Sequence, residues 1–125
     1  MATPFADDRL YDFGVDEIYT NGDRLDIQET EPSTYAEATS TYTLGNKTSL
    51  SVGAPENGDA NGRKVVVAAI TDGTVSGTGT ATYFTICDTG NSRLLIKEEL
   101  ASPQGVSSGN TFTLTEFDIT IPDVA

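Results

Sequence analysis

Residues 83–100 read YFTICDTGNSRLLIKEEL, and this stretch decides the fold class. Its first five residues are mostly aromatic or β-branched, which favours an extended strand. The segment DTGN at 88–91 carries the residue types of a tight turn. After this turn, three apolar residues are spaced to share one side of a strand: Leu94, Ile96 and Leu100. The stretch therefore predicts a β-hairpin with strands at 83–87 and 92–100.

Short apolar runs and turn residues continue on both sides of this hairpin. Thr is frequent, and 12 Gly and 5 Pro interrupt the chain at short intervals. A strand is predicted at 24–28, with Leu25 and Ile27 inward, and others are predicted at 49–52, 65–70 and 110–121. The run 65–70 is apolar throughout, which is typical of a strand covered on both faces. Turns or loops are predicted at 53–62, 71–73 and 101–109.

The last strand region contains a break in its side-chain period. Phe112 and Leu114 are even-numbered, whereas Phe117, Ile119 and Ile121 are odd-numbered. Because successive side chains of a strand point to opposite faces, one regular strand cannot keep all five inward. The change of phase near Thr115-Glu116 predicts either a β-bulge or a strand that passes from one sheet to another.

Helical patterns are short. Apolar residues recur at roughly helical spacing over 8–19, although Gly14 interrupts the pattern and a strand alternation fits it as well. Residues 34–39 can form one helical turn, with Ser33 or Thr34 as its cap. We expect a flexible N-terminal arm at 1–8 and a single β domain at 9–125. The predicted fold class is all-β: a β-sandwich or small barrel of about six to eight short antiparallel strands, with at most a short N-terminal helix.

The charge balance limits the classes of partner. The chain has 19 Asp and Glu against 7 Lys and Arg, a formal net charge of −12. Only Arg63 and Lys64 are adjacent cations, so we expect no basic patch for nucleic acid or anionic lipid. The acidity either keeps an exposed protein soluble or complements a basic partner surface. No stretch approaches the roughly 18 apolar residues of a membrane span, and the N-terminus lacks a signal-peptide pattern.

The sequence shows no catalytic machinery. It contains no histidine, and Cys87 stands alone in an apolar strand pattern, where a small buried hydrophobic residue is expected. Lys64 and Lys97 are conceivable bases for a serine, but both occupy strand positions typical of a solvated face. Glu98 and Glu99 point to opposite faces of a strand, so they cannot form one carboxylate pair. We therefore predict no enzymatic activity, no catalytic residue and no cofactor.

Two glycine-containing segments match ligand-binding motifs only in part. The segment NGDANG at 57–62 resembles the start of an EF-hand loop, with oxygen-bearing side chains at alternate positions and Gly at the sixth. Its twelfth position is Ala68 instead of Glu, so we interpret the segment as a turn-rich loop and predict no metal site. Gly77-Thr78-Gly79 lacks the Lys-Ser/Thr of a phosphate loop, and we expect it to mark a bend or bulge.

Five segments have a distinctive wording: QETEPSTYAEATS at 28–40, LGNK at 44–47, NGRKV at 61–65, DTGNSRLL at 88–95 and SGNTFTL at 108–114. They resemble a group of small proteins encoded among the virion genes of tailed bacteriophages. The similarity covers roughly residues 24–122 and does not extend over the N-terminal arm. It falls on turns and strand edges and supplies no catalytic residue. The resemblance implies a component of a phage particle, in particular a head decoration (cement) protein bound outside the capsid shell.

The leading prediction is therefore a capsid decoration protein, made in the host cytoplasm and located on the outside of the virion. Its partners would be the major capsid protein or another virion protein, together with copies of itself, a trimer by analogy. One alternative is a head–tail connector, tail or fibre component. Another is a carbohydrate- or receptor-binding β-sandwich. The candidate sugar-stacking side chains for this last class are Tyr11, Tyr19, Tyr35, Tyr42 and Tyr83.

Overall fold

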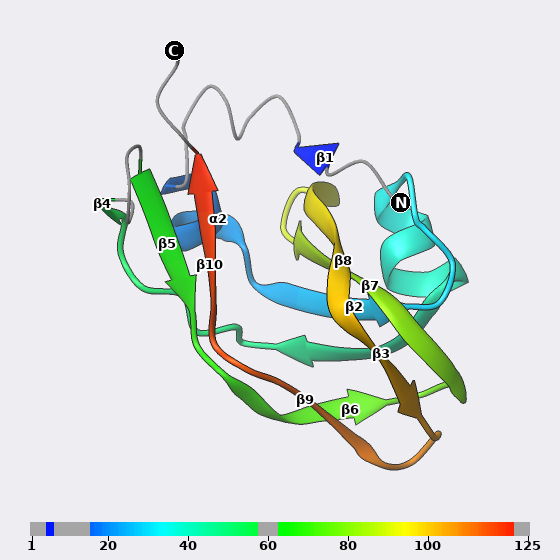
Figure 1. Ribbon diagram of the computed structural model, residues 1–125. Coiled ribbons are helices and arrows are strands. Elements are labelled where there is room, and N and C mark those ends of the chain that lie inside the picture. Colours follow the sequence, from blue (N-terminus) through cyan, green and yellow to red (C-terminus); the bar gives the residue numbers. More distant parts are fainter. Residues whose placement is uncertain (1–4, 7–15, 58–62, 122–125) are drawn as a thin grey trace.

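The computed structural model describes residues 5–6, 16–57 and 63–121, and most of them lie in antiparallel strands (Figure 1). The strands are β1 (Phe5–Ala6), β2 (Arg24–Gln28), β3 (Thr43–Thr48), β4 (Glu56–Asn57), β5 (Arg63–Val67), β6 (Ile70–Val75), β7 (Gly79–Asp88), β8 (Arg93–Val106), β9 (Thr111–Leu114) and β10 (Phe117–Ile121). The helical elements are α2 (Asp16–Asn21) and the π-helix η1 (Glu37–Thr41). The prediction of a small all-β fold is confirmed.

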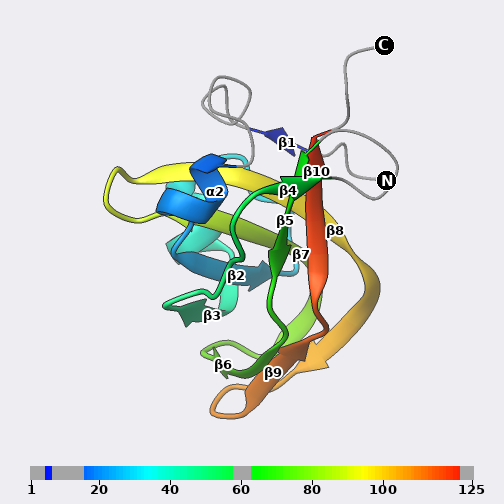
Figure 2. The same ribbon diagram turned by 90° about the vertical axis from the view of Figure 1, so that its left-hand side faces the viewer.

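The strands form two sheets. The larger sheet has seven strands in the order β1-β8-β7-β2-β3-β6-β9, and the smaller has three in the order β10-β5-β4. Every described pairing is antiparallel, as expected for strands joined by short turns. The larger sheet is strongly curled, and β5 and β10 run across its open side (Figure 1, Figure 2).

The predicted hairpin is formed by β7 and β8. The Asp88 carboxylate accepts hydrogen bonds from the backbone N–H groups of Gly90 and Asn91, which holds the turn. One detail of the prediction is wrong: Leu94 does not share a face with Ile96. Leu94 pairs with Cys87 and Ile96 with Ile86, so Leu95 is an extra residue that reverses the side-chain phase.

Two strands pass together from one sheet to the other. The phase break at Thr115-Glu116 lies where β9, in the larger sheet, continues as β10, in the smaller sheet. Of the two predicted alternatives, a β-bulge and a change of sheet, the structure shows the second. The run 65–70 also passes between the sheets: β5, in the smaller sheet, ends before Ala68-Ala69, and β6, in the larger sheet, begins after them. The expectation of one strand covered on both faces was therefore wrong, because its apolar residues serve two sheets and Val66 is half exposed.

The main core lies between the concave face of the larger sheet and the inner face of the smaller one. Its buried members come from both sheets and from α2: Ile18, Leu25, Ile27, Val65, Val67, Ile70, Val75, Ala81, Phe84, Ile86, Leu95, Ile96, Val106, Phe112 and Ile119. Leu25 and Ile27 point inward as predicted. A second, small cluster of Ala38, Cys87 and Leu94 lies on the convex face, where Tyr35 packs against it. The middle of the larger sheet is thus covered on both faces.

Three other predicted boundaries differ from the structure. The strand expected at 49–52 is reduced to one bridge between Val52 and Val67, and the preceding residues form β3 instead. The turn expected at 71–73 is a bulge inside β6, where Gly73 pairs with Phe112. A Cβ atom at Gly73 would lie 2.3 Å from the Phe112 ring, so this position needs glycine. The loop expected at 101–109 is largely strand, because β8 continues to Val106.

The two helical elements agree in part with the prediction. Helix α2 ends at Asn21, where Gly22 N–H donates to the Ile18 carbonyl, whereas most of the interval 8–19 lies outside the described residues. The turn predicted at 34–39 exists, and the Thr34 hydroxyl accepts a hydrogen bond from the Glu37 N–H. Of the arm predicted at 1–8, only β1 is described, and it pairs with Ile96 and Lys97 of β8.

Candidate functional site

A groove separates β8 from the connected strands β9 and β10, at the place where the curled sheet fails to close. Its volume is about 500 Å³. It is lined by Phe84, Glu98, Glu99, Leu100, Ala101, Ser102, Gln104, Thr113, Leu114, Thr115, Phe117 and Asp118. In both views β10 lies between β5 and β8 (Figure 1, Figure 2). Among the described strands β10 pairs only with β5, so its other edge has no described partner strand, and its first two residues, Phe117 and Asp118, line this groove.

Two aromatic rings form the apolar floor of the groove. The centroids of Phe84, from β7, and Phe117, from β10, are 4.9 Å apart with an interplanar angle of 60°. This edge-to-face contact joins the two sheets at the base of the groove and is favourable beyond the area that it buries. Leu100 and Leu114 pack beside it against the main core.

Glu98 introduces a charge next to this floor. It pairs with Phe84 across the β7–β8 ladder, so its side chain is on the concave side of the sheet with Phe84. Burial raises the pKa of the Glu98 carboxyl. Glu98 has no hydrogen-bond or ion-pair partner among the residues that the structure describes. Asp118, on the β10 side, is already engaged by the Lys64 ammonium at 3.2 Å.

The two walls of the groove differ in regularity. On β8, Gln104 pairs with Ala81 and Glu99 pairs with Tyr83, so residues 100–103 bulge out of the β7–β8 ladder. Pro103 lies in this bulge and has no N–H to donate. Bulges and prolines both protect an exposed strand edge from pairing. In contrast, all five residues of β10 pair with β5 in unbroken register, and none of them is a proline.

A side-chain amide closes one end of the groove. The Gln104 Nε2 donates to the Thr113 carbonyl at 3.0 Å, and the Gln104 Oε1 accepts from the Thr113 N–H at 3.5 Å. The carboxamide thus satisfies both backbone groups of Thr113 in the way that a neighbouring strand would. The bond joins β8 to β9 where no ladder between them is present in the described chain. Within residues 16–57 and 63–121, the strand edge beside the groove that has no such substitute partner is therefore that of β10.

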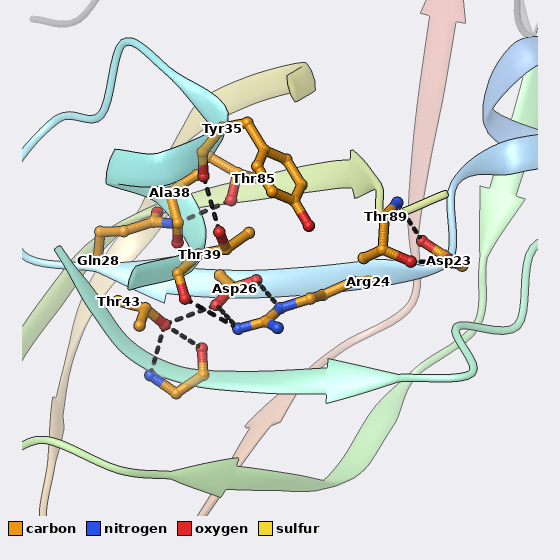
Figure 3. A network of polar contacts seen from close by, with 11 residues as sticks. Asp23, Arg24, Asp26, Gln28, Tyr35, Ala38, Thr39, Thr43, Thr85 and Thr89 are labelled. Carbon is orange, nitrogen blue, oxygen red and sulfur yellow. Dashed lines mark hydrogen bonds and ion pairs between the residues drawn. The ribbon is translucent and has the colours of Figure 1, made fainter. Parts of the chain in front are cut away.

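A buried polar network on the convex face fixes the opposite side of the sheet (Figure 3). Asp26 is fully buried in β2 and accepts hydrogen bonds from Arg24 at 2.7 and 3.0 Å and from the Thr43 hydroxyl at 2.6 Å. Burial raises the pKa of Asp26, an effect that these hydrogen bonds oppose, and the hydrogen bond to Asp26 raises the pKa of Arg24. The network is a structural element, because Arg24 also donates to the Thr39 carbonyl and so ties η1 to the sheet.

Gln28 makes the second attachment of η1. Its Nε2 donates to the Ala38 carbonyl at 3.0 Å and to the Thr85 hydroxyl at 2.8 Å (Figure 3). Gln28 and Thr85 are both fully buried. The second face of β2 is therefore buried as well, and it carries the polar side chains of Asp26 and Gln28.

The structure separates the polar residues that the sequence singled out. Cys87 is buried, and burial raises the pKa of its thiol to about 12, so it is not a reactive nucleophile. Lys64 approaches Asp118 and Glu56, whereas Lys97 donates to the Pro32 carbonyl and pairs with Glu31. The side chains of Lys64 and Lys97 are 13% and 12% exposed. The expectation that they lie on a solvated face is therefore wrong. No single site brings them together.

The remaining candidates also lie apart. Tyr19 is exposed on α2, and three tyrosines are half buried on other elements or loops: Tyr35, Tyr42 and Tyr83. Tyr11 and most of the 57–62 segment lie outside the described residues. Gly77 lies at a bend just before β7, as predicted, and Gly79 is the first residue of this strand.

The groove was not predicted from the sequence, although one signal was present. Ile96 and Leu100 were assigned to one face of β8, and Glu98 occupies the position between them. A charged residue in the middle of an apolar face is unusual unless it meets a partner. The pattern alone could have indicated this residue as a site, although it could not have indicated what faces it.

Within the described part of the chain, no group of three or more Asp, Glu, His or Cys side chains is arranged to hold a metal ion. No described helix has the length and apolar character needed to span a bilayer. Comparison with known protein families, curated proteins and solved structures finds no match. The resemblance to phage virion proteins therefore stays a prediction.

Proposed function

We propose that this protein is a structural component of a tailed-phage particle, a head decoration protein that binds the outside of the capsid shell through protein–protein contacts. The observation that supports the proposal best is the groove between β8 and β10. It combines an apolar aromatic floor, an acidic side chain and a strand edge that no other described strand pairs with. These are features that recognise a stretch of polypeptide rather than a small polar substrate.

The acidity of the domain and the contacts on both faces of its larger sheet fit the same role. A formal net charge of −12 disfavours contact with the packaged nucleic acid and favours an outward position. The buried polar network and the edge-to-face ring pair hold both faces of the larger sheet. Such a domain can present one fixed surface to many equivalent shell positions. The phage context itself comes from the sequence resemblance.

The test is decoration of particles that lack the protein. Particles of the encoding phage, assembled with this gene deleted, are mixed with the purified protein and imaged by cryo-EM. Added density at repeated positions on the shell is expected, and particles that already carry the protein serve as the saturated control. Density confined to the connector or tail, or no added density, would contradict a decoration role.

A further inference from the structure

The outer edge of β10 is the least protected strand edge that borders the groove. It is five residues long, about 17 Å at the usual rise per residue. Its ladder with β5 is regular, so the N–H and C=O groups of its other edge, which has no partner strand in the described part of the chain, form a straight row. The facing wall, β8, is bulged over residues 100–103 and contains Pro103. Only one of the two walls can accept another strand without rearrangement.

The chemistry around this edge selects the kind of strand. Phe84 and Phe117 provide an apolar surface below it, and Glu98 provides a half-buried carboxylate across the groove that no described residue pairs with. A segment with apolar residues on one side and a lysine or arginine would satisfy both features. A second copy of this chain would not satisfy them. It has the same net charge of −12, and its own β10 contains the acidic residue Asp118 and no lysine or arginine.

We propose that the outer edge of β10 binds an extended segment of a partner protein as an added fourth strand of the small sheet, and that a lysine or arginine of this segment pairs with Glu98. The inference rests on the proposed function, because strand addition would be the way in which this protein binds the shell or another virion protein. Main-chain hydrogen bonds to β10 provide affinity, and the Glu98 pair together with the aromatic floor provides specificity.

The mode can be tested without any phage particle. The probes are fluorescein-labelled, acetylated six-residue peptides rich in Val and Thr, with one Lys placed at each position in turn and matched peptides that carry Gln instead. Binding is measured by fluorescence anisotropy at low and moderate salt. At least one Lys peptide should bind, and its Gln counterpart should bind about tenfold more weakly. Failure of the whole panel would overturn the proposal.

Two variants examine the charge. Glu98→Gln should weaken the Lys peptide about tenfold and leave the Gln peptide unchanged, so that the two changes are coupled in a double-mutant cycle. Asp72→Asn removes the same charge from an exposed position outside the groove and is the matched control. Equal weakening by the two variants would mean a general charge effect and would refute the pairing with Glu98.

Peptide N-methylation examines the backbone. A strand added to one edge donates through alternate N–H groups, so N-methylation of one alternate set should abolish binding and methylation of the other set should not. Equal effects of the two sets would exclude strand addition. In sedimentation, the free protein should be monomeric. If it is instead a dimer that the peptide dissociates, the occupant of the β10 edge is a second copy of this chain, and the proposal of a partner segment is wrong.

The two proposals fail in different ways. If the unmodified protein decorates particles but no peptide binds, or if Glu98→Gln decorates as well as the unmodified protein, the strand-addition inference fails and the proposed function stands. If peptides bind as described but particles are not decorated, the proposed function fails and the groove remains a peptide site.

Discussion

Gly73 of β6 lies opposite Phe112 of β9 in the larger sheet, and the aromatic ring occupies the space where a side chain at position 73 would lie. Among the residues that the structure describes, Phe112 is the largest fully buried side chain, with 1% of its surface exposed. A Cβ atom added at Gly73 would lie 2.3, 2.4 and 2.6 Å from three atoms of its ring. Ordinary contacts are about 3.5–4.0 Å, so the ring must move by roughly 1 Å inside a packed core. Gly73→Ala should therefore lower the free energy of unfolding by about 3 kcal/mol, at the upper end of overpacking effects.

The assay is urea unfolding in a double-mutant cycle. Phe112→Ala alone should lower the free energy of unfolding by about 4 kcal/mol. In that background Gly73→Ala should have almost no effect, because the ring that it meets is gone, which gives a coupling of about 3 kcal/mol. Gly105→Ala, where an added Cβ meets nothing within 4 Å, is the matched control and should be near neutral. Additive effects in the cycle, or equal losses at Gly73 and Gly105, would refute this packing.

Three further predictions concern buried groups. Because burial raises the thiol pKa of Cys87 to about 12, Ellman's reagent at pH 8 should react only after unfolding, and rapid reaction of the native protein would contradict the burial. Thr43→Val should lower the free energy of unfolding by about 1.5 kcal/mol, measured by urea titration, since Asp26 loses a hydrogen bond to its carboxylate; an unchanged midpoint would argue against the network. Burial raises the pKa of Glu98 in the folded state above its pKa in the unfolded state. Ionised Glu98 therefore lowers the free energy of unfolding at a pH above the folded-state pKa. This loss of stability disappears as the pH falls below the unfolded-state pKa. Glu98→Gln should accordingly stabilise the protein at pH 7 more than at pH 4 in urea titrations, whereas exposed Glu116→Gln should show no such difference.

Much of the fold could be predicted because its information is local. The hairpin of β7 and β8 depends on the turn chemistry of Asp88 to Asn91, and the change of sheet at Thr115-Glu116 depends on the parity of apolar residues. Each of these patterns can be recognised from a short stretch of sequence, without knowledge of the rest of the chain. The interval 65–70 shows the limit of such reasoning, because an unbroken apolar run does not reveal where β5 ends and β6 begins.

The errors arise where tertiary contacts override local preference. β3 was missed because its residues look like a polar turn, yet β2 and β6 pair with it on both sides. The Asp72-Gly73 turn signal marks a bulge, because Gly73 leaves room for a ring from a neighbouring strand.

The groove could not be predicted from the sequence. It exists only because the curled sheet brings β8 beside β10. These two strands belong to different sheets, and no sequence pattern predicts that they lie side by side without pairing. Glu98 was visible as a charge on an apolar face, but the strand that lies across the groove from it was not.

The most direct test of the central claim, that β10 offers a strand edge for a basic segment, is an NMR titration of the ¹⁵N-labelled protein with the best Lys peptide. The amide signals of residues 117–121 should shift, and alternate amides among them should become protected from hydrogen exchange. Glu98 and its neighbours in β8 should also shift, whereas η1 and the Asp26 network on the convex face should not. Shifts centred on the convex face, or on β8 without β10, would contradict the account.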